Sequence, residues 1–351
     1  MTQASNVSTM PPSAQSADPA RRRPPRGGSP KATGAWRRRL VTAGHAALSL
    51  GLCAYLVAGI DATQLRVALA AADRTRVVAA LLVLAVVPVL AAERWLRTCA
   101  ATGIRAGRGF IYPAAYAGMF AGQFLPSALG MDAVRLALLW RQRVGLSAGI
   151  QSLAIDRGCG VAALAALAVG GLPFTLDRLP PGLPVPAIAL TLLGVAAGVA
   201  LLFADRLPVP RWLRQGPSGR VLALLRATRA AICTRDVLVA FLLGGAIHLI
   251  AIFAVLLLAR AFGFELHYRD LLTLTAAAIF VSMLPVSFNG WGVREGALML
   301  GLSLLAVPRE IALLIAFLYG AGGALASLPG SLSWRRLRAP ADGTGQDSRS
   351  A

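Results

Sequence analysis

The sequence predicts an all-α polytopic membrane protein with about six full spans and two re-entrant helical hairpins in an inverted-topology repeat. Three observations lead to this class. The 351 residues are 56% hydrophobic and 14% charged, whereas soluble domains carry about 25% charged residues. Several apolar runs reach the roughly 20 residues that cross a bilayer as a helix. Two longer apolar regions are interrupted near their centres by proline, glycine and charged residues.

The chain divides by composition into two tails and one membrane domain. Residues 1–39 are rich in Pro, Ser, Gly and Arg, so we expect a disordered basic cytoplasmic tail. Residues 40–335 form the predicted transmembrane domain, with repeat halves at about 40–172 and 187–334. Residues 336–351 are a short polar segment, which we expect to be a cytoplasmic tail.

Full spans are predicted where apolar runs are long enough to cross the hydrocarbon. Residues 61–76 look amphipathic and are predicted to lie along the membrane interface. The predicted spans are residues 41–60, 77–96, 147–172, 187–204, 237–259 and 310–333.

Two regions, residues 110–140 and 271–307, are too long for one crossing and are predicted to be re-entrant hairpins. Their centres read "LPSALGMDAVR" and "LPVSFNGWGVR". Proline removes a backbone donor and glycine permits sharp turns, so both stretches predict helix breaks. Ser287 and Asn289 are candidates to bond the unpaired peptide groups and a substrate. The predicted break residues are Pro126, Gly130, Pro285, Gly290 and Gly292.

The distribution of arginine predicts the orientation. Eight basic residues precede the first predicted span, and seven arginines lie in residues 205–236. With both termini in the cytoplasm, every strongly basic segment falls on the cytoplasmic side, as the positive-inside rule requires. Each half then reads span, span, hairpin, span in opposite orientations, which is the inverted repeat of many transporters. We therefore expect a multi-pass protein of the bacterial inner membrane.

Charged residues within the apolar regions are candidate site residues, because ionisable groups inside a membrane are costly unless they are paired or hydrated. Arg135, Arg157 and Arg294 are predicted to bind substrate. Asp132, Asp156 and Glu295 are their candidate charge partners. The alternative is a set of interhelical ion pairs that only stabilise packing. Glu93, Arg94 and Arg97 sit at a predicted span end and are interpreted as interfacial anchors.

Other chemistries find little support in the sequence. The formal net charge of +20 suits an anionic membrane face or nucleic acid. The arginines crowd the ends of apolar runs, which favours the membrane. The four cysteines and three histidines have no metal-ligand spacing, and no phosphate-binding glycine loop is present. We expect no metal, no cofactor, no catalytic residue and no nucleic-acid partner.

The motifs resemble those of a known family. "FLPSALGMDAVR", the Asp-Arg of "LAIDRGCG", "LPVSFNGWGVREG" and the later "LPG" at Leu328–Gly330 are similar to the lysylphosphatidylglycerol synthase transmembrane family. It is also described as the flippase-like or UPF0104 family. The resemblance covers roughly residues 40–335. One departure is Gly130-Met131-Asp132, where many relatives have two glycines before the aspartate.

The resemblance implies a stand-alone membrane domain that moves a lipid between leaflets, without the aminoacyltransferase domain of the best-known members. The expected partner is a phospholipid, a hopanoid or a lipid-linked glycan, whose polar or anionic head group the arginines would bind. Two alternatives are a membrane-embedded transferase acting on a lipid-linked substrate and a non-catalytic partner of a separately encoded lipid-modifying enzyme. The sequence contains no DxD motif, so a transporter is favoured over an enzyme.

Overall fold

The protein is all-helical over the residues that the structure, a computed structural model, describes. These are residues 33–58, 60–125, 129–175, 216–283 and 290–338. Two compact units divide the chain, residues 1–41 and 42–351, and every contact below lies in the second unit. The helices are α1 (Thr33–Val57), α2 (Ala62–Ala71), α3 (Arg74–Ala101), α4 (Arg108–Gly122), α5 (Leu129–Arg141), α6 (Leu146–Gly171), η2 (Leu172–Phe174), α8 (Gly216–Ile232), α9 (Arg235–Ala261), α10 (Tyr268–Ser282), α11 (Val293–Ser303), α12 (Arg309–Ser327) and α13 (Pro329–Arg338).

Four predicted spans coincide with long apolar helices. Over the described part of the chain, α3, α6 with η2, α9, and α12 with most of α13 are long and apolar enough to cross a membrane. Residues 41–60 correspond to α1, which qualifies only together with α2 as a pair bent by 84°. The predicted span at residues 187–204 lies outside the described residues. The described residues therefore contain four to five candidate spans.

The tail boundaries differ slightly from the sequence prediction. Helix α1 begins at Thr33, so residues 33–39 are helical where a disordered tail was expected. Helix α13 continues to Arg338 and so extends past the predicted end of the membrane domain at residue 335. Both extensions consist of short arginine-rich sequence attached to apolar helices, which propagate once nucleated.

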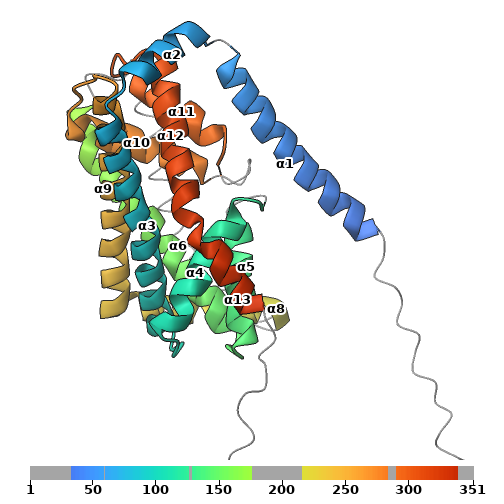
Figure 1. Ribbon diagram of the computed structural model, residues 1–351. Coiled ribbons are helices and arrows are strands. Elements are labelled where there is room, and N and C mark those ends of the chain that lie inside the picture. Colours follow the sequence, from blue (N-terminus) through green and yellow to red (C-terminus); the bar gives the residue numbers. More distant parts are fainter. Residues whose placement is uncertain (1–32, 59, 126–128, 176–215, 284–289, 339–351) are drawn as a thin grey trace, which may run out of the picture. The chain divides into compact units, whose positions relative to one another are not determined.

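Helices α3 and α9 form the central antiparallel pair and lie side by side (Figure 1). At one end, the Asp73 N–H donates to the carbonyl of Ala261 at 2.9 Å. At the other end, Arg97 Nη1 lies 3.4 Å from Asp236 Oδ1. The start of α3 therefore adjoins the end of α9, and the end of α3 adjoins the start of α9.

Both interrupted apolar regions form a pair of short helices that pack against each other, α4 with α5 and α10 with α11. Helix α4 and helix α10 each contain 15 residues, which is about 22 Å at 1.5 Å per residue. This is shorter than a hydrocarbon core of about 30 Å. Neither helix can cross the membrane alone, which is consistent with the two-helix arrangement predicted for each region.

The residues at the breaks have different roles. Gly290 and Gly292 have φ angles of 78° and 85°, a region that other residues rarely adopt. Gly130 instead lies within α5, where an added Cβ would overlap the side chain of Leu125. Close packing therefore explains glycine at position 130 better than a turn does. Pro126, Pro285, Ser287 and Asn289 lie outside the described residues.

The same turn joins α3 to α4 and α9 to α10. Gly103 and Gly263 follow the first helix of each pair with φ angles of 77° and 85°. The next residue donates its N–H back to the helix, from Ile104 to Cys99 at 2.9 Å and from Phe264 to Ala259 at 3.0 Å. In both cases the following helix begins five residues after the glycine, at positions 108 and 268.

A second turn is also used twice, between α5 and α6 and between α11 and α12. Arg143 and Ala306 adopt φ angles of 58° and 60°, which is uncommon for residues other than glycine. The N–H of the next residue, Val144 or Val307, donates to the helix at 3.1 Å or 3.2 Å. Each following helix begins three residues after the left-handed residue, at positions 146 and 309.

The end of one long helix in each half packs against the short helices of the other half. Gly330, at the start of α13, lies so close to α4 that an added Cβ would overlap the backbone carbonyl of Tyr116. Gly171, at the end of α6, lies against α10, and an added Cβ would approach Thr273 N within 2.9 Å. The contact between α13 and α4 can be followed in Figure 1. Both glycines are therefore required by close backbone approach.

We expect Gly330→Ala to destabilise the protein strongly, because the new methyl group would meet backbone atoms that cannot move aside cheaply. The matched control is Gly323→Ala in α12, where an added Cβ meets nothing within 4 Å. That change should be neutral or stabilise by up to about 1 kcal/mol through helix propensity. Thermal unfolding of the purified proteins in detergent measures the difference. Equal melting temperatures for the two variants would contradict the close packing of α13 on α4.

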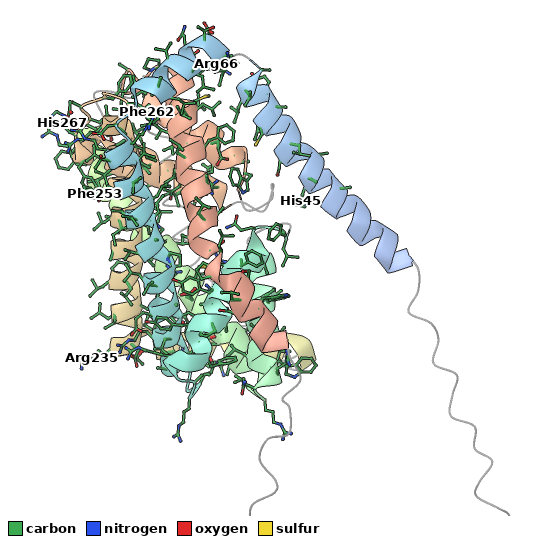
Figure 2. All side chains as sticks on the ribbon, viewed as in Figure 1. His45, Arg66, Arg235, Phe253, Phe262 and His267 are labelled. Carbon is green, nitrogen blue, oxygen red and sulfur yellow. The ribbon has the colours of Figure 1, made fainter. Side chains whose placement is uncertain are left out.

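The two ends of the bundle differ in charge. Figure 2 shows Arg66, Phe262 and His267 toward one end and Arg235 at the other. Without α8 and α13, the described ends of α3, α5 and α9 and the start of α4 give the end with Arg235 six arginines and two acids, a net charge of +4. These residues are Arg97, Arg105, Arg108, Arg141, Arg143 and Arg235 with Glu93 and Asp236. The opposite end has six arginines and five acids, a net charge of +1, namely Arg66, Arg74, Arg76, Arg260, Arg269 and Arg309 with Asp61, Asp73, Glu265, Asp270 and Glu310.

Candidate functional site

Three helices bring five charged side chains together in the first half of the protein. Helix α3 supplies Arg94, α5 supplies Asp132 and Arg135, and α6 supplies Asp156 and Arg157. We name these five residues the first charge cluster. In α5 the two residues are three apart and share a face, and in α6 the two charges are adjacent. The cluster therefore depends on the packing of α3 and α5 against α6.

Asp156 is at the buried end of the cluster, with 1% of its side chain exposed. Arg94 donates from Nε to Asp156 Oδ1 at 2.8 Å and from Nη2 to Oδ2 at 3.3 Å. Arg135, whose side chain is 2% exposed, donates from Nη1 to the same Oδ2 at 3.4 Å. One carboxylate therefore holds two guanidinium groups from two different helices.

Asp132 and Arg157 are at the more accessible end. Arg157 Nε donates to Asp132 Oδ2 at 2.8 Å, and the side chains are 33% and 14% exposed. The other oxygen of Asp132 lies 4.0 Å from Arg135 Nη1. Asp132 is therefore located between two arginines and connects the buried end of the cluster to the accessible one.

The packing around the cluster leaves room only for small residues. The guanidinium of Arg135 lies over the ring of Trp95 at 5.0 Å, an attractive cation–π geometry. An added Cβ at Gly118 would lie 2.9 Å from Arg135 Cγ, and one at Gly160 would lie 2.9 Å from Arg94 Nη1. Two glycines on helices α4 and α6 therefore make space for two arginine side chains.

The first charge cluster carries more positive than negative charge. Over the described residues, its three guanidiniums and two carboxylates sum to +1. Inside a membrane protein such an excess is costly unless water or an anion accompanies it. Arginine also forms two parallel hydrogen bonds with phosphate or carboxylate groups. The geometry is therefore suited to an anion that approaches the exposed end at Arg157.

The second half contains a smaller and electrically neutral arrangement, which we name the second charge cluster. Glu295 has no exposed side-chain area, and its Oε1 accepts from Arg294 Nε at 2.9 Å and from Nη2 at 2.5 Å. Its Oε2 accepts from the Gly292 N–H at 2.6 Å and so caps the start of α11. The guanidinium of Arg294 lies over the rings of Trp291 at 4.9 Å and Tyr319 at 5.8 Å.

The structure groups the sequence-predicted residues by half. Asp132 pairs with Arg157, Arg135 pairs with Asp156, and Arg294 pairs with its neighbour Glu295. Arg135 and Arg294, which end the two quoted stretches, belong to different clusters and occupy different positions in their helices. The contribution of Ser287 and Asn289 stays a prediction, because both lie outside the described residues.

Sequence reasoning assigned Arg94 to the membrane interface, but the structure places it in the first charge cluster beside Asp156. Its neighbours Glu93 and Arg97 do form a more exposed network, in which Glu93 accepts from Arg97, Arg108 and Tyr112 at distances of 2.8–3.2 Å. Arg94 lies one helical turn before Thr98, which is fully buried. That burial is a property of the tertiary structure, so the sequence alone contains no signal that separates Arg94 from its neighbours.

Comparisons with known proteins add the family. No match was found among curated proteins. A family model described as the lysylphosphatidylglycerol synthase TM region matches residues 43–330. The match spans both charge clusters and all four long apolar helices, and it identifies a multi-pass membrane protein of a family associated with lipids. The chain therefore belongs to the lysylphosphatidylglycerol synthase TM region family.

Proposed function

We propose that this protein moves a lipid with an anionic head group between membrane leaflets and binds the head group at the accessible end of the first charge cluster. The observation that carries the proposal is the excess of three arginines over two carboxylates. Arg157 makes the direct contact, since its side chain is the most exposed in the cluster at 33%. Arg135 and Arg94 hold Asp156 and so stabilise the buried end of the cluster.

The architecture that we propose for transport is an inverted repeat, with α3 to α6 equivalent to α9 to α12. The duplicated turns at Gly103 and Gly263, and at Arg143 and Ala306, support it. So does the antiparallel packing of α3 on α9, because equivalent helices of an inverted repeat run in opposite directions. The crossed packing of Gly330 and Gly171 is a third reciprocal feature.

In this repeat the acids of the two clusters occupy equivalent positions, whereas their arginines do not. Asp132 lies 11 residues before the left-handed Arg143, and Glu295 lies 11 residues before the left-handed Ala306 (143 − 132 = 306 − 295). Arg135 and Arg294 lie 8 and 12 residues before the same points. In this alignment Asp132 and Glu295 are equivalent, and the clusters differ in the arginines around them. The proposal thus assigns anion binding to one half.

We also propose that the end with net charge +4 faces the cytoplasm, in the plasma membrane of a bacterium, with both chain termini on that side. Cytoplasmic segments near spans carry an excess of arginine and lysine. The opposite end has nearly as many acids as arginines. The sequence of α13 is consistent with this orientation, since the helix ends in the arginine-rich sequence "SWRRLR".

The proposal is tested with purified protein in liposomes that contain fluorescent phosphatidylglycerol, by measuring exchange between leaflets. Arg157→Gln is expected to lower the rate at least about tenfold, which corresponds to roughly 1.4 kcal/mol of lost head-group binding. The control is Arg105→Gln, an exposed arginine of the α3–α4 turn outside the cluster.

Equal exchange rates for the two variants would contradict the proposal. Mass spectrometry of the recovered lipid tests the transferase alternative in the same vesicles, once a lipid-linked substrate and a donor are added. A covalently modified lipid that requires the protein would replace transport as the assigned function. Restoration of transport only by an added lipid-modifying enzyme would favour the partner role.

A further inference from the structure

We propose that Asp132 sets the charge of the head group that the protein accepts, so that the native site prefers one negative charge over two. This inference rests on the proposed function. It concerns a specificity-determining residue rather than the existence of the site. The argument depends on the charges of the first charge cluster and on the position of Asp132 within it.

Asp156 is fully occupied by protein cations. It accepts three hydrogen bonds from Arg94 and Arg135, and its side chain is 1% exposed. A ligand anion cannot easily displace it, because the displaced carboxylate would stay buried. Asp156 therefore stays in place when an anion binds, and Asp132 is the carboxylate at the accessible end that adjusts the total charge of the cluster.

Asp132 partly neutralises the arginines around it. Its Oδ2 accepts from Arg157 at 2.8 Å, and its Oδ1 lies 4.0 Å from Arg135 Nη1. Neither Asp132 Oδ1 nor Arg135 Nε has a hydrogen-bond partner in the part of the chain that the structure describes, although both atoms are buried. The Nε–H of Arg135, on a side chain that is 2% exposed, is a donor suited to an oxyanion.

The total charge then selects among head groups. With the cluster at +1, a phosphodiester with one negative charge gives a neutral complex. A phosphomonoester carries about −1.5 to −2 near neutral pH and leaves negative charge uncompensated. An uncharged lipid leaves the cluster with its positive charge. Since uncompensated charge in a membrane protein is disfavoured, the site should prefer a phosphodiester lipid.

The decisive variant is Asp132→Asn, which keeps the shape of the side chain and an oxygen that can accept from Arg157. It removes one negative charge, so the cluster changes from +1 to +2. We expect the variant to gain preference for a phosphomonoester. Asp236→Asn is the matched control, because Asp236 also pairs with an arginine but lies on α9 at 37% side-chain exposure, outside the cluster.

The experiment compares leaflet exchange of labelled phosphatidylglycerol and labelled phosphatidic acid at pH 8, where the phosphomonoester is a dianion. The native protein and the control should favour phosphatidylglycerol. Asp132→Asn should shift the ratio of the two rates at least about tenfold toward phosphatidic acid, a factor that corresponds to about 1.4 kcal/mol. Asp132→Glu keeps the charge and should keep the native ratio.

The outcomes separate this inference from the proposed function. If the native protein moves neither lipid, or if Arg157→Gln behaves like the native protein, the proposed function fails. If Arg157→Gln loses transport while Asp132→Asn keeps the native ratio, only the selectivity role of Asp132 is overturned. If Asp132→Asn folds but does not transport either lipid, the dissociation constants of dioctanoyl forms of the two lipids are compared in detergent. A ratio of these constants equal to that of the native protein overturns the inference. If Asp132→Asn does not fold while Asp132→Glu does, Asp132 is structural and the inference is overturned.

Discussion

Replacement of Asp156 by alanine is expected to remove most of the protein from the membrane. Asp156 is the carboxylate on which Arg94 and Arg135 converge, and its side chain is 1% exposed. Without it, two guanidiniums from α3 and α5 would face each other across a cavity inside the bundle. Removal of one partner from a buried ion pair costs about 3–5 kcal/mol, which is a large part of the roughly 5–15 kcal/mol that stabilises a typical domain.

The abundance of the variant and its thermal unfolding in detergent measure this effect. Asp236→Ala is the control, since Asp236 also pairs with an arginine but is 37% exposed. An ion pair of that kind contributes about 0–1 kcal/mol, so the control should accumulate normally. If Asp156→Ala accumulates and unfolds like the control, the buried end of the first charge cluster does not stabilise the fold.

Arg294→Ala is expected to have the second largest effect. From the structure, we expect the variant to be unstable and to accumulate at lower abundance. The sequence alone predicts loss of transport at near-normal abundance, with Arg294 facing a hydrated cavity, and the alternative is instability if Arg294 is half of a dry pair. Glu295 has no exposed side-chain area and Arg294 retains 13%. The alanine variant would strand a buried carboxylate, at a cost of about 3–5 kcal/mol.

A double variant tests this explanation. Arg294→Ala combined with Glu295→Gln should recover much of the abundance, because glutamine is neutral and still offers an oxygen to the Gly292 N–H. Arg157→Ala serves as the comparison, since its side chain is 33% exposed and its loss should leave abundance near normal. Normal abundance of Arg294→Ala alone would return Arg294 to the set of substrate-binding candidates.

Much of the membrane architecture could be predicted from local sequence. The lengths of the apolar runs indicated α3, α6, α9 and α12, since a hydrophobic stretch of about 20 residues has few stable alternatives to a spanning helix. Glycine, proline and charge in the two interrupted regions indicated pairs of short helices there. The interfacial segment predicted at residues 61–76 implied a bend after the first span but not its angle, which is 84° between α1 and α2.

The pairing within the candidate site was less predictable. Asp132 and Arg135 share a face of α5 at a spacing that suggests a pair, yet their closest atoms are 4.0 Å apart and each makes its shorter contact with α6. Arg94 was missed because its position in the sequence resembles a span end. Its guanidinium enters the bundle only because Gly160 on α6 leaves space for it.

The sequence by itself determined the class of the protein, its apolar helices, its two interrupted regions and the family motifs, because these depend on hydrophobic length and on backbone chemistry within a few residues. Only the tertiary structure decided which charges meet. Side chains such as Arg94 and Asp156 are 62 positions apart, and their contact depends on the rotation and depth of three packed helices. It is therefore the packing of α3, α5 and α6 that leaves the first cluster with an excess charge, whereas Glu295 neutralises Arg294 within the second.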